Sequence, residues 1–243
     1  MNEIIKVENL TKKIGRKTIL DDFSFSIDEG KIVGIVGPNG AGKSTLIKTM
    51  LGLYHITSGN IYINGYSVKK DLEQALKQVG CIIENPDVYN NLSGRKNIEL
   101  YAELNDKMDN DYINKIISLV KLDNRIDDKV NTYSLGMKQR LGIACALVNK
   151  PKILILDEPT NGLDPFGIKE LRELLKLINE QNNITIILCS HILEEMEKIC
   201  DEIVMIDDGH FIDYVSIHEL KNKNISLEDI FIEKLHGSKG QLR

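Results

Sequence analysis

Residues Gly37–Ser44 read GPNGAGKS and match the pattern G-x-x-x-x-G-K-S at every fixed position. The apolar run before them, Lys31–Gly37 (KIVGIVG), is typical of a short strand buried on both faces. After them, Leu46, Met50 and Leu53 recur at helical spacing. A glycine-rich turn between such a strand and such a helix can fold around phosphate oxygens, because its N–H groups point inward and its glycines have no Cβ to obstruct the approach. The stretch therefore predicts a phosphate-binding loop.

Two side chains at the end of this loop have predicted chemical roles. The positive end of the helix dipole favours a bound anion, and Lys43 is expected to act in catalysis by reaching the β- and γ-phosphates of a nucleotide. The hydroxyl of Ser44 is expected to ligate Mg²⁺. The alternative, a glycine-rich turn with an incidental Lys-Ser pair, is disfavoured because both flanking elements are of the required kind. The predicted nucleotide-contacting residues of the loop are Gly37, Pro38, Asn39, Gly40, Ala41, Gly42, Lys43, Ser44 and Thr45.

Two adjacent acids, Asp157 and Glu158, end a second buried strand in the stretch Lys152–Thr160 (KILILDEPT). Neighbouring residues of a strand face opposite ways, so the two carboxylates cannot share one role. We expect Asp157 to support the Mg²⁺ shell. Glu158 precedes Pro159, which favours an extended backbone there, and a carboxylate fixed beside the γ-phosphate can orient and activate water. An acidic turn at a strand end is the alternative for this pair.

A histidine, His191, directly follows the next predicted strand, Ile184–Ser190 (ITIILCS). A lone histidine is more often a structural residue than a catalytic one. The carboxyl ends of parallel strands meet in one crevice, however, and this strand end is expected to reach the same crevice as the loop. We therefore favour a catalytic contact of His191 with the γ-phosphate.

The order of the predicted elements indicates an α/β fold. Phe23, Phe25 and Ile27 alternate as in a strand with one buried face, and later strands alternate with helices, which predicts a parallel sheet with ligands at the carboxyl ends of its strands. Between 85 and 150 the pattern is helical. We predict one domain with three parts: an α/β core with a β subdomain at 1–84 and 151–225, a helical subdomain at 85–150 and a C-terminal tail at 226–243.

Composition and charge restrict the class of protein. The 243 residues carry 31 Lys and Arg against 36 Asp and Glu, a net charge of −5 that is mixed along the chain. A nucleic-acid surface needs a clustered basic face, so we expect no nucleic-acid partner. No apolar run approaches the ~18 residues that span a bilayer, and the N-terminus carries acids instead of a secretion signal, so we expect a cytoplasmic chain. The 4 cysteines form no CxxC pair and are expected to be reduced.

Two further motifs flank the acidic strand. Tyr133–Arg140 (YSLGMKQR) precedes a predicted helix shortly ahead of that strand, and Asn161–Pro165 (NGLDP) follows it. With the phosphate-binding loop and the two acids, this order of motifs resembles the ATP-binding cassette of ABC transporters along nearly the whole chain. Tyr133–Arg140 takes the place of the signature LSGGQ-x-R, and Asn161–Pro165 takes that of the D-loop. The resemblance implies a P-loop NTPase (RecA-like) core with an antiparallel β subdomain and an inserted α-helical subdomain.

The same resemblance implies an ATPase that has ATP and Mg²⁺ as cofactors and drives transport through separate membrane permease subunits. In the family two cassettes pair head to tail, so Ser134 and Gly136 are expected to contact the γ-phosphate bound to the other subunit. Asp164 of the D-loop is expected to belong to the nucleotide site. The helical subdomain is where the family meets its permease. A homodimer is expected, peripheral at the inner face of the cell membrane.

Three positions depart from the family pattern. Ile14 stands where an aromatic residue usually stacks on adenine, so adenine is expected to rest on an aliphatic surface. Glu84 replaces the usual Gln after the strand ending at Ile83, which places a charged acceptor near Mg²⁺ and water, with a plain surface acid as the alternative. The signature reads SLGMK in place of SGGQ. Together with DEPTNGLDPFGIKELR and SHILEE, these features resemble the ATP-binding subunits of bacitracin-type and lantibiotic-immunity exporters.

The leading hypothesis is therefore an ATP-hydrolysing subunit that energises export of antimicrobial peptides. The nearest alternative keeps this role and changes the cargo to a small drug or an ion. A non-transport ABC ATPase of DNA repair or translation is less favoured, because the sequence shows no second cassette, no long coiled-coil insertion and no zinc-binding cysteine pair. A nucleotide switch without hydrolysis is disfavoured, because Lys43, Asp157, Glu158 and His191 are all present.

Overall fold

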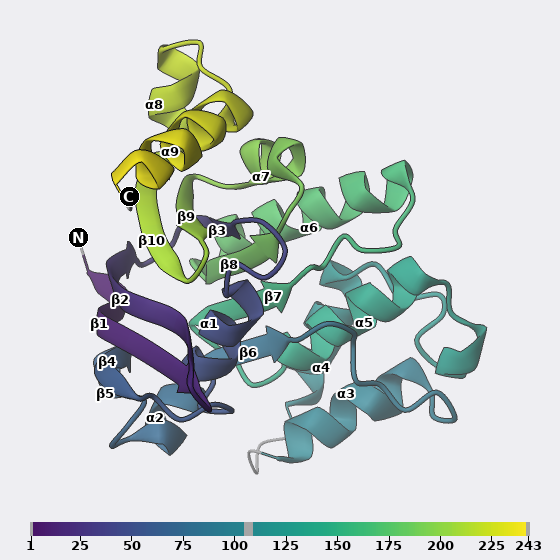
Figure 1. Cartoon of the computed structure of the whole chain (residues 1–243). Coiled ribbons are helices and arrows are strands. Elements are labelled where there is room, and N and C mark those ends of the chain that lie inside the picture. Colours follow the sequence, from purple (N-terminus) through teal and green to yellow (C-terminus); the bar gives the residue numbers. More distant parts are fainter. Residues whose placement is uncertain (1, 105–108, 242–243) are drawn as a thin grey trace. The chain divides into compact units, whose positions relative to one another are not determined.

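The computed structural model describes residues 2–104 and 109–241 (Figure 1). The chain divides into two compact units. The first unit comprises residues 1–78 and 185–243, and the second unit comprises residues 79–184. The chain therefore leaves the first unit, completes the second and returns. The boundaries predicted from sequence at 84/85 and 150/151 stay a prediction.

An antiparallel sheet of four strands lies in the first unit, in the order β2-β1-β4-β5. Phe23 and Ile27 of β2 are fully buried while the residues between them alternate in exposure, because one face of the strand packs on the core. The hairpin between β4 and β5 turns at Asn64 (φ 48°) and Gly65 (φ 81°), as an Asn-Gly pair predicts. The strand bounds are β1 Glu3–Ile14, β2 Lys17–Asp28, β4 Ser58–Ile63 and β5 Tyr66–Ser67.

The first unit also contains the buried strand β3, whose five residues are all buried, as its continuous apolar run predicts. β3 pairs in parallel with β8 on one side and with β9 on the other, and β10 runs antiparallel to β9. Phe25 of β2 stacks on Phe211 of β10, with ring centroids 6.0 Å apart. The strand bounds are β3 Ile32–Val36, β8 Thr185–Ser190, β9 Glu202–Asp207 and β10 His210–Ser216.

Helix α1 begins at Lys43 and buries Leu46 and Met50 as predicted. The expectation that Leu53 joins this buried face is wrong. Gly52 adopts φ 69°, a left-handed conformation that ends the helix, and Leu53 beyond it is 61% exposed. The helices of the first unit are α1 Lys43–Met50, α2 Leu72–Leu76, α7 Leu193–Ile199, α8 Ile217–Asn222 and α9 Leu227–Gln241.

In the second unit, β6 and β7 pair in parallel. Between them the described residues form helices and turns, apart from one isolated β-bridge that joins Ser93 to Lys129. The elements of this unit are β6 Val79–Ile82, α3 Gly94–Glu103, α4 Asn110–Leu119, the short 3₁₀ helix η1 Val130–Thr132, α5 Leu135–Leu147, β7 Ile153–Asp157 and α6 Pro165–Asn182.

Side-chain caps fix where the α-helices of the second unit begin. In each case an oxygen of the residue before the helix accepts a hydrogen bond from an N–H three residues later, which satisfies one of the unpaired donors of the first turn. The caps are Ser93 for α3, Asp109 for α4, Ser134 for α5 and Asp164 for α6. The starts of α5 and α6 are thereby set at the two motifs that the sequence singles out.

All four cysteines are free thiols, as expected from their spacing, and Cys145, Cys189 and Cys200 are buried while Cys81 is exposed. None of the helices in the described ranges combines the length and the apolar character that crossing a bilayer requires.

Candidate functional site

The phosphate-binding loop joins the carboxyl end of β3 to the start of α1 in the first unit (Figure 1). Gly40 (φ 84°) and Gly42 (φ 106°) adopt left-handed conformations that residues with a Cβ rarely reach. Gly42 is also the N-cap of α1 and brings no side chain to cap it. A helix end whose first N–H groups lack a capping side chain suits a bound anion.

The β9–β10 hairpin of the same unit packs closely against this loop. A Cβ added at Gly37 would lie 2.3 Å from the carbonyl oxygen of Ile206, so no other residue fits there without a backbone shift. The N–H of Gly209 donates to the carbonyl oxygen of Ala41 at 3.1 Å. The loop therefore keeps its shape through backbone contacts and close packing.

Lys43 lies across the loop. Lys43 is only 7% exposed, and its Nζ donates hydrogen bonds to the carbonyl oxygens of Gly37 at 2.6 Å and Pro38 at 3.1 Å. A buried ammonium needs polar partners, and phosphate oxygens would offer it stronger, charge-assisted ones at the same place. The next residue, Ser44, is exposed, so its hydroxyl is accessible to a ligand of the loop.

His191 reaches the same edge of the first unit as the loop. Strands β3 and β8 pair in parallel with Val36 opposite Ser190, so Gly37 and His191 are the first residues past two neighbouring strand ends. His191 is exposed. The structure therefore brings this histidine and the phosphate-binding loop together, as the strand order predicts.

Ile14 lies at the end of β1, beside Gly15 (φ 59°) in the tip of the β1–β2 hairpin. It is 49% exposed. An exposed aliphatic side chain offers a base apolar contact without an aromatic ring to stack on.

Three predicted acids gather at one edge of the second unit. Strands β6 and β7 pair in parallel with Ile82 opposite Leu156. Asp157 is the last residue of β7 and Glu158 follows it, while Glu84 lies two residues past the end of β6. Asp157 is 2% exposed, Glu158 is half-buried and Glu84 is exposed. The three carboxylates thus differ in their access to water, which suits them to different roles.

The predicted extended backbone at Glu158 is wrong. Glu158 adopts φ 51°, in the left-handed region, and Glu84 does so as well with φ 64°. The restriction that Pro159 imposes acts mainly against the right-handed helical region, whereas a turn here requires the chain to reverse: the N–H of Asn161 donates to the carbonyl oxygen of Glu158 at 3.1 Å. The carboxylate of Glu158 is therefore held by a turn and not by an extended strand.

The signature and the D-loop meet within the second unit. Ser134 is exposed and its Oγ accepts from the N–H of Met137 at 3.3 Å, while Asp164 Oδ1 accepts from the N–H of Gly167 at 2.8 Å. A Cβ added at Gly136 would contact the side chain of Leu163 at 3.8 Å. A void of only about 10 Å³ separates the two motifs, lined by Gly136, Gln139, Arg140, Leu163, Gly167, Glu170 and Leu171.

An ion pair between α5 and α6 escaped sequence reasoning. Arg140 Nη1 lies 3.8 Å from Glu170 Oε2, and both residues are partly buried. No spacing rule relates them, because the pair depends on how two helices separated by a strand pack together. The role of Asn97 was not predicted from sequence either. Asn97 is fully buried; its Oδ1 accepts a hydrogen bond from the N–H of Tyr89, and its Nδ2 donates to the carbonyl oxygen of Tyr89.

Metal-ligating side chains are sparse in the described ranges, where no three of His, Cys, Asp and Glu lie close enough to hold an ion. A hydroxyl such as that of Ser44 and a carboxylate such as that of Asp157 are oxygen donors that Mg²⁺ accepts.

Comparison with known proteins agrees with these features. Residues 20–161 match the family model described as ABC transporter. The chain is 46% identical to the uncharacterized ABC transporter ATP-binding protein YhcH of Bacillus subtilis, over 95% of this chain and 75% of that protein. It is 41% identical to the bacitracin transport ATP-binding protein BcrA of Enterococcus faecalis, over 92% of this chain and 73% of that protein. The lantibiotic transport ATP-binding protein SrtF of Streptococcus pyogenes is 43% identical to it, over 86% of this chain and 89% of that protein.

A solved structure gives the same result for the fold. The dimeric post-hydrolysis structure of the ATP-binding cassette MJ0796, bound to ADP and Pi, superposes with a TM-score of 0.76 and 27% identity, over 88% of this chain and 98% of that one. The fold is that of an ABC ATPase cassette. The chain therefore belongs to the ABC transporter family. It is an ATP-binding subunit of a transporter of this family, and it is an ATPase.

Proposed function

We propose that the chain energises the export of antimicrobial peptides, of the bacitracin or lantibiotic type, through separate membrane subunits. The observation that carries this proposal is the sequence similarity to BcrA (41% identity over 92% of the chain) and to SrtF (43% identity over 86% of the chain). The chain also contains the phosphate-binding loop and the acidic strand end. A small drug or an ion as cargo would need the same motor.

Each predicted site residue has a place in the proposed reaction. The loop holds the β- and γ-phosphates through its N–H groups and Lys43, with adenine against Ile14. Glu158 orients a water molecule and accepts its proton as the water oxygen attacks the γ-phosphorus. The bond from that phosphorus to the β–γ bridging oxygen breaks, giving ADP and phosphate. His191 contacts the γ-phosphate from its strand end.

Magnesium fits the donor set that the chain offers. The Ser44 hydroxyl and the Asp157 carboxylate would hold the ion, with Glu84 near its water shell. When bound, the ion would supply neutralisation of negative charge on the nucleotide phosphates. The deep burial of Asp157 supports this role, because a carboxylate withdrawn from bulk water gains most from a cation.

A second cassette and a permease complete the proposed machine. Ser134 and Gly136 of one copy would contact the γ-phosphate held by the other, with Asp164 at the same interface. Support comes from the exposed Ser134 at the start of α5 and from the dimeric state of the MJ0796 structure. The permease would keep the chain at the inner face of the membrane. ATP would then act as a ligand with unequal affinity for two dimer states, which is how it moves the membrane partner.

Peptide sensitivity of the native host tests the cargo. The host with the unmodified chromosome is compared with one that encodes Glu158→Gln and with a control that encodes Glu173→Gln on the exposed face of α6, and equal protein levels are verified by immunoblot. The panel contains bacitracin, several lantibiotics and unrelated small drugs. Selective hypersensitivity of the Glu158→Gln strain to one peptide class is the expected result. An unchanged sensitivity to all peptides would overturn the proposal that the cargo is a peptide. New sensitivity to a small drug would instead indicate a small drug as the cargo.

A further inference from the structure

The segment that leads into the signature is bound to the start of α3. This pre-signature segment, residues 120–132, joins α4 to Tyr133, the first residue of the signature. Four backbone hydrogen bonds fix it to residues 90–95: Gly94 N to Asp128 O (3.3 Å), Arg95 N to Ile126 O (2.8 Å), Val130 N to Leu92 O (3.0 Å) and Asn131 N to Asn90 O (3.0 Å). Although the segment is mostly irregular, its backbone is therefore anchored along its length.

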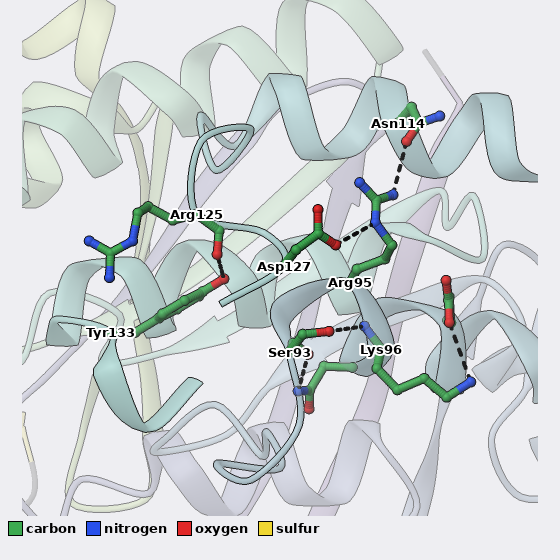
Figure 2. Close-up of polar contacts among 9 residues, drawn as sticks. Ser93, Arg95, Lys96, Asn114, Arg125, Asp127 and Tyr133 are labelled. Carbon is green, nitrogen blue, oxygen red and sulfur yellow. Dashed lines mark hydrogen bonds and ion pairs between the residues drawn. The ribbon is translucent and has the colours of Figure 1, made fainter. Parts of the chain in front are cut away.

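Side chains strengthen the same attachment. Arg95 Nε donates to Asp127 Oδ1 at 2.9 Å, and Arg95 Nη1 donates to Asn114 Oδ1 of α4 at 3.1 Å (Figure 2). One guanidinium thus joins α3, α4 and the pre-signature segment. The first residue of the signature, Tyr133, is the point where this anchored segment meets α5.

Tyr133 is held at both its backbone and its side chain. It is 6% exposed, its N–H donates to Val130 O at 3.0 Å, and its phenol donates to Arg125 O at 2.6 Å (Figure 2). Burial raises the pKa of the phenol above its usual value, so the hydroxyl remains a donor at neutral pH. The aromatic ring and its hydroxyl therefore close residues 125–133 into a loop that ends at Ser134.

The glycine at position 94 makes room for this phenol. A Cβ added to Gly94 would lie 2.5 Å from the Tyr133 hydroxyl oxygen. Gly94 has no left-handed backbone to explain it, since it is the first residue of α3, where other residues are equally suited to the backbone. The close approach of Tyr133 supplies a physical reason for glycine at this position.

We propose that Tyr133 is a positioning residue for the signature, which through its hydrogen bond to Arg125 fixes the place of Ser134 at the start of α5. The inference rests on the proposed role of Ser134 at a neighbouring nucleotide. Ser134 caps α5 only through a long bond of 3.3 Å, so the helix alone holds its hydroxyl weakly. Tyr133 supplies the second constraint, from the side of the anchored segment.

The substitution Tyr133→Phe isolates the hydroxyl. It keeps the aromatic ring and removes one of two hydrogen bonds to the Arg125 carbonyl oxygen, which still accepts from the N–H of Asp128 at 3.0 Å. We expect kcat for ATP to fall about fivefold to thirtyfold at 25 °C, as misplacement of a group that acts in the transition state predicts, while KM and nucleotide affinity change by less than about twofold. Tyr112→Phe is the matched control, because its phenol also donates to a backbone carbonyl, Leu147 O at 3.4 Å, in the same unit.

A purely structural hydrogen bond gives a different result. Tyr133→Phe would then lower the unfolding temperature, but the kcat of the folded protein would match the wild type and Tyr112→Phe. Thermal unfolding measured beside the kinetics separates the two cases. Equal kcat values for the wild type and both variants overturn the inference.

Gly94→Ala tests the same contact from the other side. Its Cβ should displace the phenol and lower kcat in the wild-type background. It should lower kcat much less when Tyr133→Phe has removed the hydroxyl, because only the contacts with Ile126, at 2.9 Å to Cδ1 and 3.0 Å to the carbonyl oxygen, then remain. Additive losses from the two substitutions would contradict the inference.

Ser134→Ala distinguishes failure of the inference from failure of the proposed site. A fall in kcat with Ser134→Ala but none with Tyr133→Phe overturns the positioning role alone. If Ser134→Ala leaves kcat unchanged while Glu158→Gln abolishes turnover, the signature has no catalytic role, and both the composite site and the inference are wrong.

Discussion

The phosphate-binding loop and the signature both lie at the start of a helix, but the chain holds them in different ways. The loop is fixed by glycines and close packing: Gly42 caps α1 without a side chain, and Gly37 leaves no space for a Cβ. The signature is fixed by side chains, with Ser134 as a cap and Tyr133 bonded to Arg125. The loop is thus a backbone structure, whereas the signature depends on contacts with an irregular segment.

This difference bears on the proposed function, in which the two helix ends have different tasks. A loop that binds a nucleotide in its own subunit benefits from a rigid shape, since preformed N–H groups bind phosphate without ordering cost. In the proposed dimer, a signature that meets a nucleotide held by another copy would also follow the opening and closing of the two subunits. Because side chains attach the signature to the pre-signature segment, that segment of the same unit can set the position of the signature.

The largest expected effect comes from removing the base while both helix ends stay intact. Glu158→Gln should lower kcat by about 10²–10⁴, because the amide cannot accept the proton of the attacking water. Nucleotide affinity should remain within about twofold, since the loop is unchanged. Steady-state ATPase assays and equilibrium nucleotide binding measure the two quantities. Normal turnover by the folded variant would refute the role given to Glu158.

Two glycine substitutions break the backbone character of the loop to different degrees. Gly37→Ala should cost about 3 kcal/mol of unfolding free energy, because its Cβ meets the Ile206 carbonyl at 2.3 Å. Gly40→Ala has open space and only left-handed strain, which predicts a cost of about 1 kcal/mol. Urea unfolding of the two variants tests the order. A larger cost for Gly40→Ala would contradict the packing argument.

Two cap substitutions separate helix stability from catalysis in the second unit. Asp164→Ala should lower the unfolding free energy by about 1 kcal/mol, and Ser134→Ala by less, because the Asp164 bond is 2.8 Å and the Ser134 bond is 3.3 Å. The ATPase should show a loss for Ser134→Ala beyond what its small effect on stability accounts for. Denaturant unfolding and kcat are measured on the same preparations. Loss of kcat in proportion to stability in both variants would mean that Ser134 is a cap and nothing more.

The smallest effect on ATP binding and turnover together is expected from Glu84→Gln. The substitution restores the residue usual in the family and removes one charge, so ATP affinity should change by less than about twofold. Coupling to transport should change more, which peptide resistance of the host measured beside ATPase activity would show. Equal losses of binding and resistance would count against a coupling role.

Much of the loop could be predicted from sequence, because its determinants are local. A buried strand, three glycines and a helix follow one another within Lys31–Met50, and each has a physical signature of its own. The family and the α/β fold followed from the order of such motifs. The acids Asp157 and Glu158 were equally visible, since they end a continuous apolar run.

Other features could not be predicted, because they depend on contacts between segments. The left-handed backbone of Glu158 results from a turn that competes with the preference set by Pro159. Leu53 is exposed because Gly52 ends α1 early. The bond of Tyr133 to Arg125 and the pairing of Arg95 with Asp127 require the fold of an irregular segment, for which sequence periodicity gives no signal.

Mixing two inactive variants tests most directly the claim that the loop and the signature are the two halves of a site shared between copies. Glu158→Gln and a signature variant, Ser134→Asp, are each purified, and ATPase activity is measured alone and after equal mixing. A site shared between copies predicts roughly a quarter of wild-type activity in the mixture, because half of the dimers are mixed and each has one intact site of two. A mixture as inactive as its components would place the loop, Glu158 and Ser134 in one subunit's site and contradict the account.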